Sequence, residues 1–147
     1  MNISGISGAK VAFCASIGAI GGFIVDMFGG WSEDMVTLII FMAIDYIMGI
    51  IIAGVFKKSK KTASGALESK VGWKGLCKKG VTLLFVLIAH RLDVSLGVHY
   101  IKTATIIGFI VNEAISIIEN AGIMDIPLPK ALIKAVEVLK QKEEGDK

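Results

Sequence analysis

The sequence predicts an all-α integral membrane protein with four transmembrane helices and a C-terminal amphipathic helix. The chain has 147 residues, of which 54% are hydrophobic and 20% charged, and its mean hydropathy is +0.70. An ordinary soluble domain is about 45–50% apolar and about 25% charged. The apolar residues gather in long segments almost free of Lys and Arg, and a membrane-crossing helix needs roughly 20 such residues.

Two regions are expected along the chain. Residues 1–120 should form a transmembrane domain, with spans at about 10–28, 34–56, 76–96 and 101–118. Residues 121–147 should form a cytoplasmic amphipathic helix and a charged tail. The segment 76–96 is the weakest span, because Arg91 and Asp93 would each cost about 2.5–3.5 kcal/mol at the bilayer centre. A three-span form, with this segment at the membrane surface, is the alternative.

A basic loop at 57–79 predicts the orientation of the chain. Against a single acid, Glu68, it carries eight lysines: Lys57, Lys58, Lys60, Lys61, Lys70, Lys74, Lys78 and Lys79. Loops rich in Lys and Arg stay in the cytoplasm, so a chain with four spans has both termini on the cytoplasmic side of the membrane. The loop serves either as a topology anchor or as a segment lying on anionic lipid. Nucleic-acid binding is disfavoured because the charge is tied to the membrane boundary.

The sequence offers little for enzyme chemistry. Cys14, Cys77, His90 and His99 show neither a disulfide framework nor metal-ligand spacing. A phosphate-binding glycine loop and a nucleophile motif are both missing from the pattern. We therefore expect a protein that is not an enzyme and has no cofactor and no metal.

The first two apolar segments carry distinct packing features. Gly18 and Gly22 form a GxxxG pair, a spacing that lets membrane helices approach closely. Asp45, Gly49 and Ala53 share one stripe of a helix. A carboxylate inside the membrane must be protonated, paired or facing water. Asp45 is therefore either a pore-facing acid or a buried acid bonded to a neighbouring helix.

Arg91 is the candidate cation for an internal ion pair. Its partner would be Asp45 on another helix, or Asp93 on its own.

The fourth apolar segment contains a polar stripe. A polar or small residue recurs every four positions and three further polar residues lie beside them, giving the set Thr105, Gly108, Asn112, Glu113, Ser116, Glu119 and Asn120. One polar residue would be a routine contact between helices. Several at a fixed spacing favour a face turned to water or to identical neighbours.

Four features together resemble the phage-lysis and toxin-secretion holins of Gram-positive bacteria, especially the clostridial type. They are DYIMG at 45–49, SKVGWKGLCKK at 69–79, NEAISIIEN at 112–120, and the break IPLP at 126–129 before an amphipathic helix. The resemblance implies a protein that gathers in the cytoplasmic membrane, forms a homo-oligomer among the lipids and opens a lesion. An endolysin or a large toxin without a signal peptide would leave through that lesion.

Two other functions are compatible with the residues. A small proton-coupled transporter or ion channel would use Asp45 or Glu113 as its intramembrane acid. A membrane adaptor would instead recruit a partner through the basic loop and the C-terminal helix.

Overall fold

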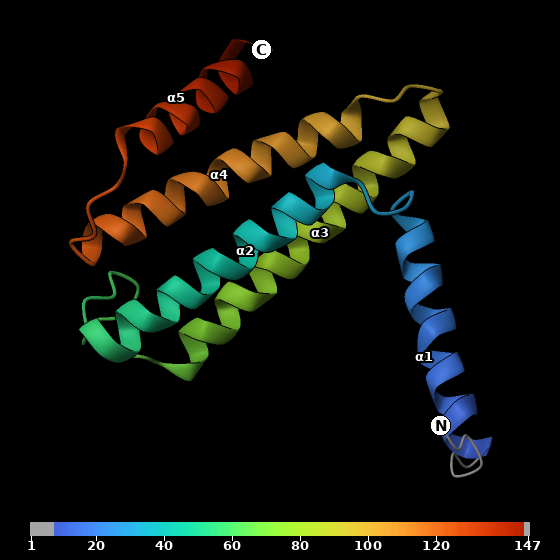
Figure 1. Ribbon diagram of the computed structural model, residues 1–147, viewed down its shortest axis with the longest axis horizontal. Coiled ribbons are helices and arrows are strands. Elements are labelled where there is room, and N and C mark those ends of the chain that lie inside the picture. Colours follow the sequence, from blue (N-terminus) through green and yellow to red (C-terminus); the bar gives the residue numbers. More distant parts are fainter. Residues whose placement is uncertain (1–7, 146–147) are drawn as a thin grey trace, which may run out of the picture. The chain divides into compact units, whose positions relative to one another are not determined.

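The described residues, 8–145 of a computed structural model, form five α-helices and one short π-helical segment, with no strand among them (Figure 1). The predicted all-α class is confirmed. The chain divides into two compact units, residues 1–31 and 32–147. Lys147 and Asp146, the end of the predicted charged tail, lie outside the described residues.

The first unit contains one helix, α1 (Gly8–Met27), which is long and apolar enough to cross a membrane. Its side chains are exposed except for the half-buried Val25. A side chain added at Gly18 or Gly22 would meet nothing within 4 Å, so their packing role stays a prediction.

The second unit begins with α2 (Glu33–Ile51), which continues into the π-helical segment η1 (Ile52–Phe56). Acidic residues stabilise a helix N-terminus because they complement its free N–H groups. Accordingly, Asp34 accepts a hydrogen bond from the backbone N–H of Met35 at 3.0 Å. The helix ends at Lys57, whose φ of 52° lies in the left-handed region and turns the chain away from the helix axis.

The next helix, α3 (Ser69–Leu96), has 28 residues and starts inside the segment expected to be loop. At 1.5 Å per residue it is about 42 Å long. Residues 69–79 contain no proline, and their two glycines lie against Tyr46 of α2, whose ring is 3.7 Å from a Cβ built at Gly75. Close packing at this point offsets the low helix propensity of glycine. The helix ends at Gly97, with φ 67°.

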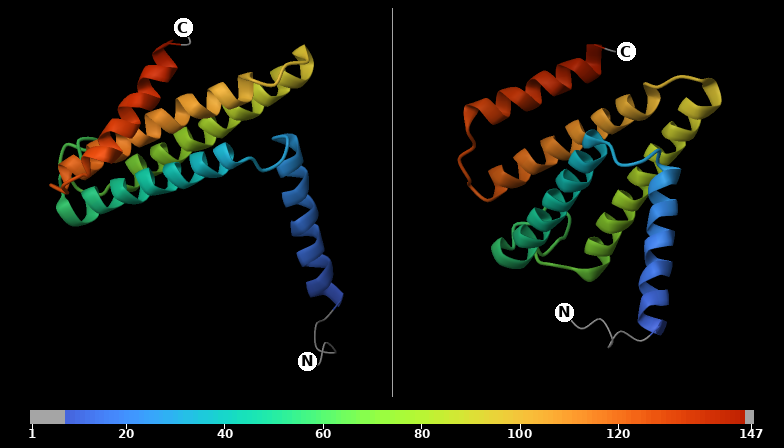
Figure 2. Two further views of the ribbon diagram at one scale, coloured as in Figure 1. Left: turned by 45° about the horizontal axis from the view of Figure 1, so that its top comes forward. Right: turned by 45° about the vertical axis from the view of Figure 1, so that its right-hand side comes forward.

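Two further helices complete this unit. The helix α4 (Ile101–Ile123) follows a short turn after α3, and α5 (Lys130–Gly145) follows Pro129. Figure 2 shows α5 turning back beside α4, which it contacts.

The directions of α2, α3 and α4 follow from their contacts. Asp45 of α2 bonds Ser116 of α4. Just past the C-terminal ends of η1 and α4, Lys58 pairs with Asp125, so α2 and α4 run parallel. The connecting helix α3 runs opposite to both, as Figure 1 shows. The side chains buried most completely come from all three helices: Leu38, Val86, Ile106 and Val111.

Within the described residues, three helical segments are long and apolar enough to cross a membrane: Gly8–Met27, Glu33–Phe56 and Ile101–Ile123. The helix α3 is not one of them, since four lysines, Arg91 and Asp93 interrupt it. It is the same segment in which the sequence predicts the weakest span.

Candidate functional site: a polar cluster inside the helical bundle

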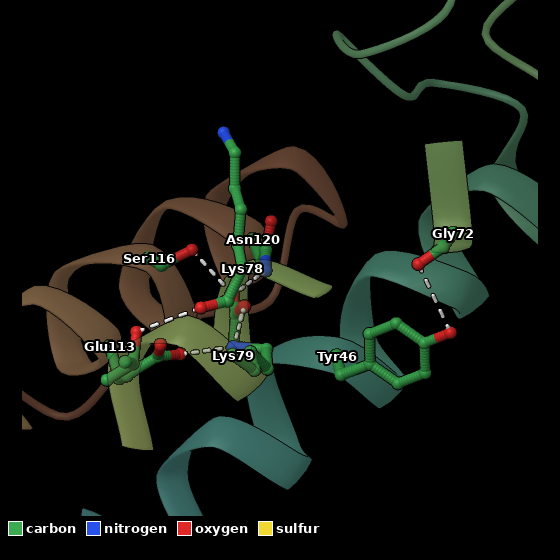
Figure 3. Close-up of polar contacts among 9 residues, drawn as sticks. Tyr46, Gly72, Lys78, Lys79, Glu113, Ser116 and Asn120 are labelled. Carbon is green, nitrogen blue, oxygen red and sulfur yellow. Dashed lines mark hydrogen bonds and ion pairs between the residues drawn. The ribbon is translucent and has the colours of Figure 1, made fainter. Parts of the chain in front are cut away.

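Five polar side chains meet inside the bundle of α2, α3 and α4, and we call them the polar cluster: Asp45, Lys79, Glu113, Ser116 and Asn120. Each helix supplies at least one member. The surrounding core is almost entirely aliphatic or methionine. Figure 3 shows the members on α4 and α3 turned toward one another.

Lys79 joins two carboxyl groups from different helices. Its Nζ lies 2.9 Å from Oδ2 of Asp45 and 2.6 Å from Oε2 of Glu113. The three side chains are only 9–13% exposed. An ion pair held away from water is weakly screened by salt, so its geometry matters more than that of a surface pair.

Asp45 has a full set of hydrogen-bond donors. Its Oδ1 accepts bonds from the Ser116 hydroxyl at 2.5 Å and from the Asn120 side-chain amide at 2.9 Å. Its Oδ2 faces Lys79. Of the two possibilities for this acid, the structure therefore places it as a buried acid bonded to neighbouring helices. Of its stripe, Ala53 is also buried and Gly49 is half-buried.

The residues of α3 show why the cluster includes Lys79. Lys79, Val86 and Asp93 are seven residues apart and therefore share one face of the helix. Val86 and Asp93 are buried, which carries Lys79 into the bundle. Lys78, one residue earlier and rotated about 100° around the helix, is exposed and points away from the cluster in Figure 3.

Lys79 is thus the member of the polar cluster that the sequence pattern assigned elsewhere, to the basic loop. Its spacing from Val86 and Asp93 is the signal that could have identified it. The other lysines of the predicted loop remain exposed, on the loop itself or on the first turns of α3: Lys57, Lys58, Lys60, Lys61, Lys70, Lys74 and Lys78.

The structure gives both proposed partners of Arg91 other contacts. Asp45 bonds Lys79. Asp93 accepts hydrogen bonds from the backbone N–H groups of Ile101 and Lys102, each at 2.9 Å. The expected ion pair is therefore corrected: Arg91 is exposed, and Asp93 instead stabilises the free N–H groups at the start of α4.

The polar stripe of α4 divides between two faces. Glu113 is buried in the cluster, and Ser116 and Asn120 are half-buried in it. Asn112 and Glu119 are exposed, on the side of α4 turned away from the buried Ile110 and Ala114. The remaining members, Thr105 and Gly108, are half-buried.

The cluster has no feature of a metal centre. In the described part of the chain, no group of three His, Cys, Asp or Glu side chains is placed to hold a metal ion. What the arrangement provides is a charged and hydrogen-bonded interior in an otherwise apolar bundle.

The chain was also compared with known proteins. Residues 22–141 match the model of the bacteriophage holin family. The chain belongs to this holin family. The match covers α2 to α4 and most of α5, but only the last residues of α1.

Relatives of this holin-family chain occur in Clostridium, Halalkalibacterium and Listeria species. An uncharacterized protein of Clostridium perfringens strain 13 is 33% identical and covers 90% of this chain and 95% of its own length. A Halalkalibacterium halodurans protein is 37% identical, covering 80% and 85%. A Listeria monocytogenes protein is 35% identical, covering 88% and 85%. No solved structure matches the chain.

The family and the apolar helices together make this chain a membrane-spanning protein of the holin type. Two of the three helices that carry the polar cluster, α2 and α4, are among the helices long and apolar enough to cross the membrane.

Proposed function

We propose that the protein is a holin that assembles in the bacterial cytoplasmic membrane and opens a lesion through which macromolecules leave the cell. The cargo is a cell-wall hydrolase or a large toxin that lacks a signal peptide. The family match supports this reading, and the polar cluster is the observation in the structure that carries it.

The cluster supports a lesion because it stores polar groups inside a lipid-embedded bundle. Lipid-facing surfaces can be wholly apolar, and a core built only for stability does as well with aliphatic side chains as with ion pairs. Asp45, Lys79 and Glu113 are satisfied by one another in the closed bundle. When bundles assemble and their helices separate, water can solvate these charged groups in place of their present partners. The described bundle corresponds to the closed form.

Helix directions support three crossings in the second unit. Because α2 and α4 run parallel, the chain must return to its starting side between them. The helix that makes this return is α3, which packs along α4. Burial of Lys79 and Asp93 within the bundle removes two charges from the lipid-facing surface. With α1, the total is four spans, and the exposed lysines around 57–78 favour N- and C-termini in the cytoplasm.

Expression in bacterial cells tests the proposed function. Induction of the native protein should stop growth and release a cytoplasmic reporter enzyme into the medium. Replacing Asn112 and Ser116 together with Leu should abolish or strongly delay the release while leaving the amount of protein in the membrane unchanged. Survival of induced cells with no enzyme release from the native protein would reject the proposal.

Single substitutions distinguish the role of the bundle-facing Ser116 from that of the exposed Asn112. Ser116→Leu removes a donor to Asp45 and should disturb the bundle. Asn112→Leu changes an exposed position and should leave the bundle folded. Release at the native time in both single variants and in the double variant would count against any role of the stripe.

The shared lysine also favours a second function, a small proton-coupled transporter or ion channel. Two carboxyl groups around one ammonium group form the kind of intramembrane site that transporters use. This function predicts a flux of one substrate that follows the pH gradient and is lost in Asp45→Asn. It predicts no leakage of proteins, which distinguishes it from a holin.

A further inference from the structure

The outward side of α4 carries a polar face that no contact within the bundle explains. Thr105, Asn112 and Glu119 are seven residues apart and so share this side, which we call the outer α4 face. Asn112 and Glu119 are exposed and Thr105 is half-buried. The helix α5 contacts α4 but leaves Asn112 and Glu119 exposed. Ile110 and Ala114, on the opposite side of α4, are buried.

Asn112 stands at the middle of this face and of the helix. It is residue 12 of the 23 in α4, so about 16 Å of helix extends on either side. In a crossing helix it lies near the bilayer centre. An amide transferred from water into hydrocarbon without a partner costs about 4–8 kcal/mol. Lipid tails offer no donor or acceptor, so the outer α4 face needs a polar partner.

The chemistry of the amide indicates what that partner is. A side-chain amide has an N–H₂ donor and a C=O acceptor, so two such amides can satisfy each other with two reciprocal hydrogen bonds. Copies of one chain insert with the same orientation, which makes their α4 helices parallel and brings equal residues to equal depth. A second Asn112 is therefore available at the required depth.

The rest of the face fits the same arrangement. A seven-residue repeat keeps one seam facing a parallel neighbour that crosses at about 20°. Thr105 hydroxyls can donate to and accept from each other. Glu119 lies about one turn from the end of α4 at Ile123, where water at the membrane surface can solvate two carboxylates.

We propose that the outer α4 face binds the same face of a second copy of this chain, with Asn112 paired to Asn112 at the centre of the contact. The proposal deepens the proposed holin function by naming its partner and contact. It gives the polar residues of α4 separate tasks. The cluster members Glu113, Ser116 and Asn120 close the bundle. The outer α4 face, which lies next to them around the helix, joins bundles to one another.

Disulfide crosslinking in membranes tests the contact. The background has Cys14 and Cys77 replaced by Ser, and Thr105→Cys is the reporter. Ile107→Cys is the matched control, because Ile107 is 37% exposed, lies two residues away and faces about 160° from Thr105. Oxidation should give a disulfide-linked dimer with Thr105→Cys and little with Ile107→Cys. Equal crosslinking at the two positions would overturn the proposal.

The amide is tested in the same background. Adding Asn112→Leu to Thr105→Cys should reduce the dimer at least several-fold, whereas Asn112→Gln should retain it. The stability of each variant in detergent, measured in parallel, should match that of the parent. Full crosslinking in a stable Asn112→Leu variant would refute the amide pairing. A disulfide between Thr105→Cys and a cysteine placed at Ile17, within one chain or between two, would refute it too, because α1 would then occupy the face.

Release of a reporter enzyme from cells separates this proposal from the proposed function. Enzyme release by native protein without Thr105→Cys crosslinking would reject the contact and leave the holin function standing. Crosslinking without enzyme release would retain the contact and reject the holin function.

Discussion

Lys78 and Lys79 are adjacent in sequence but differ in their burial and in their contacts. Lys78 is exposed, whereas the Lys79 side chain is 13% exposed and contacts two carboxyl groups. Removing one partner of a buried ion pair leaves the other charge uncompensated, and this costs about 3–5 kcal/mol in proteins.

Replacement of each lysine by Met is therefore expected to give opposite results. Lys79→Met should lower the free energy of unfolding in mixed micelles by about 3–5 kcal/mol, because Asp45 and Glu113 both lose their cation. Lys78→Met should change it by no more than about 0.5 kcal/mol, as at other surface positions. Unfolding of the purified variants at rising concentrations of a denaturing detergent measures both free energies. Equal losses of unfolding free energy in the two variants would contradict the role of Lys79 in the polar cluster.

At the scale of single residues, the sequence singled out Asp45, Glu113 and Asn120, which meet in the cluster, but not Lys79, which joins the two acids. Asp45 was expected to be either buried or pore-facing, and it is buried. Its cation was expected to be Arg91 and is Lys79.

A run of lysines beside an apolar segment indicates a loop by composition. The seven-residue spacing places Lys79, Val86 and Asp93 on one helix face. That this face is turned inward is a tertiary property, shown by the burial of Val86 and Asp93.

At the scale of helices, the turn between α3 and α4 depends on one side chain. Both oxygens of Asp93 accept backbone N–H bonds from the first residues of α4. The first N–H groups of a helix have no partner within it, and a side chain that satisfies them stabilises the helix by about 0.5–2 kcal/mol.

Asp93→Ala should therefore speed hydrogen exchange at the amides of Ile101 and Lys102 and lower stability by about 1–2 kcal/mol. Arg91→Ala is the control, because Arg91 is exposed two residues away. It should leave both amides protected. Faster exchange in the Arg91 variant, with an unchanged exchange rate in the Asp93 variant, would contradict this role of Asp93 and favour the expected Arg91 ion pair.

The apolar helices were the most predictable elements, because length and composition alone identify α1, α2 and α4. Helix ends were less predictable. The second apolar segment ends in a π-helical turn and a left-handed Lys57, features set by local backbone geometry rather than by composition. The division of the α4 stripe between two faces also required the structure, since Asn112 and Ser116 are one turn apart and yet meet different surroundings.

At the scale of the whole molecule, the directions of the helices decide the number of crossings. Two parallel helices in contact need a return segment, and the return segment here, α3, is the least apolar of the helices α1 to α4. Its most hidden charges, on Lys79 and Asp93, are directed into the bundle rather than into lipid.

Single cysteines labelled by a membrane-impermeant reagent test this topology in intact cells. With native Cys14 and Cys77 replaced by Ser, cysteines at Glu33 and His99 should react from outside, because four spans put both turns there. Cysteines at Ser64 and Lys134 should react only after the membrane is opened. All four positions are exposed in the fold. Reaction of Lys134→Cys from outside would replace four spans with three.

Release from vesicles shows whether the assembled protein passes macromolecules. Purified protein is inserted into vesicles that contain a small-ion dye and a dextran the size of a folded enzyme. The native protein should release both tracers, and Asn112→Leu, inserted in equal amount, should release little of the dextran. Release of the ion dye alone, at any protein density in the membrane, would contradict the account and favour a channel or transporter.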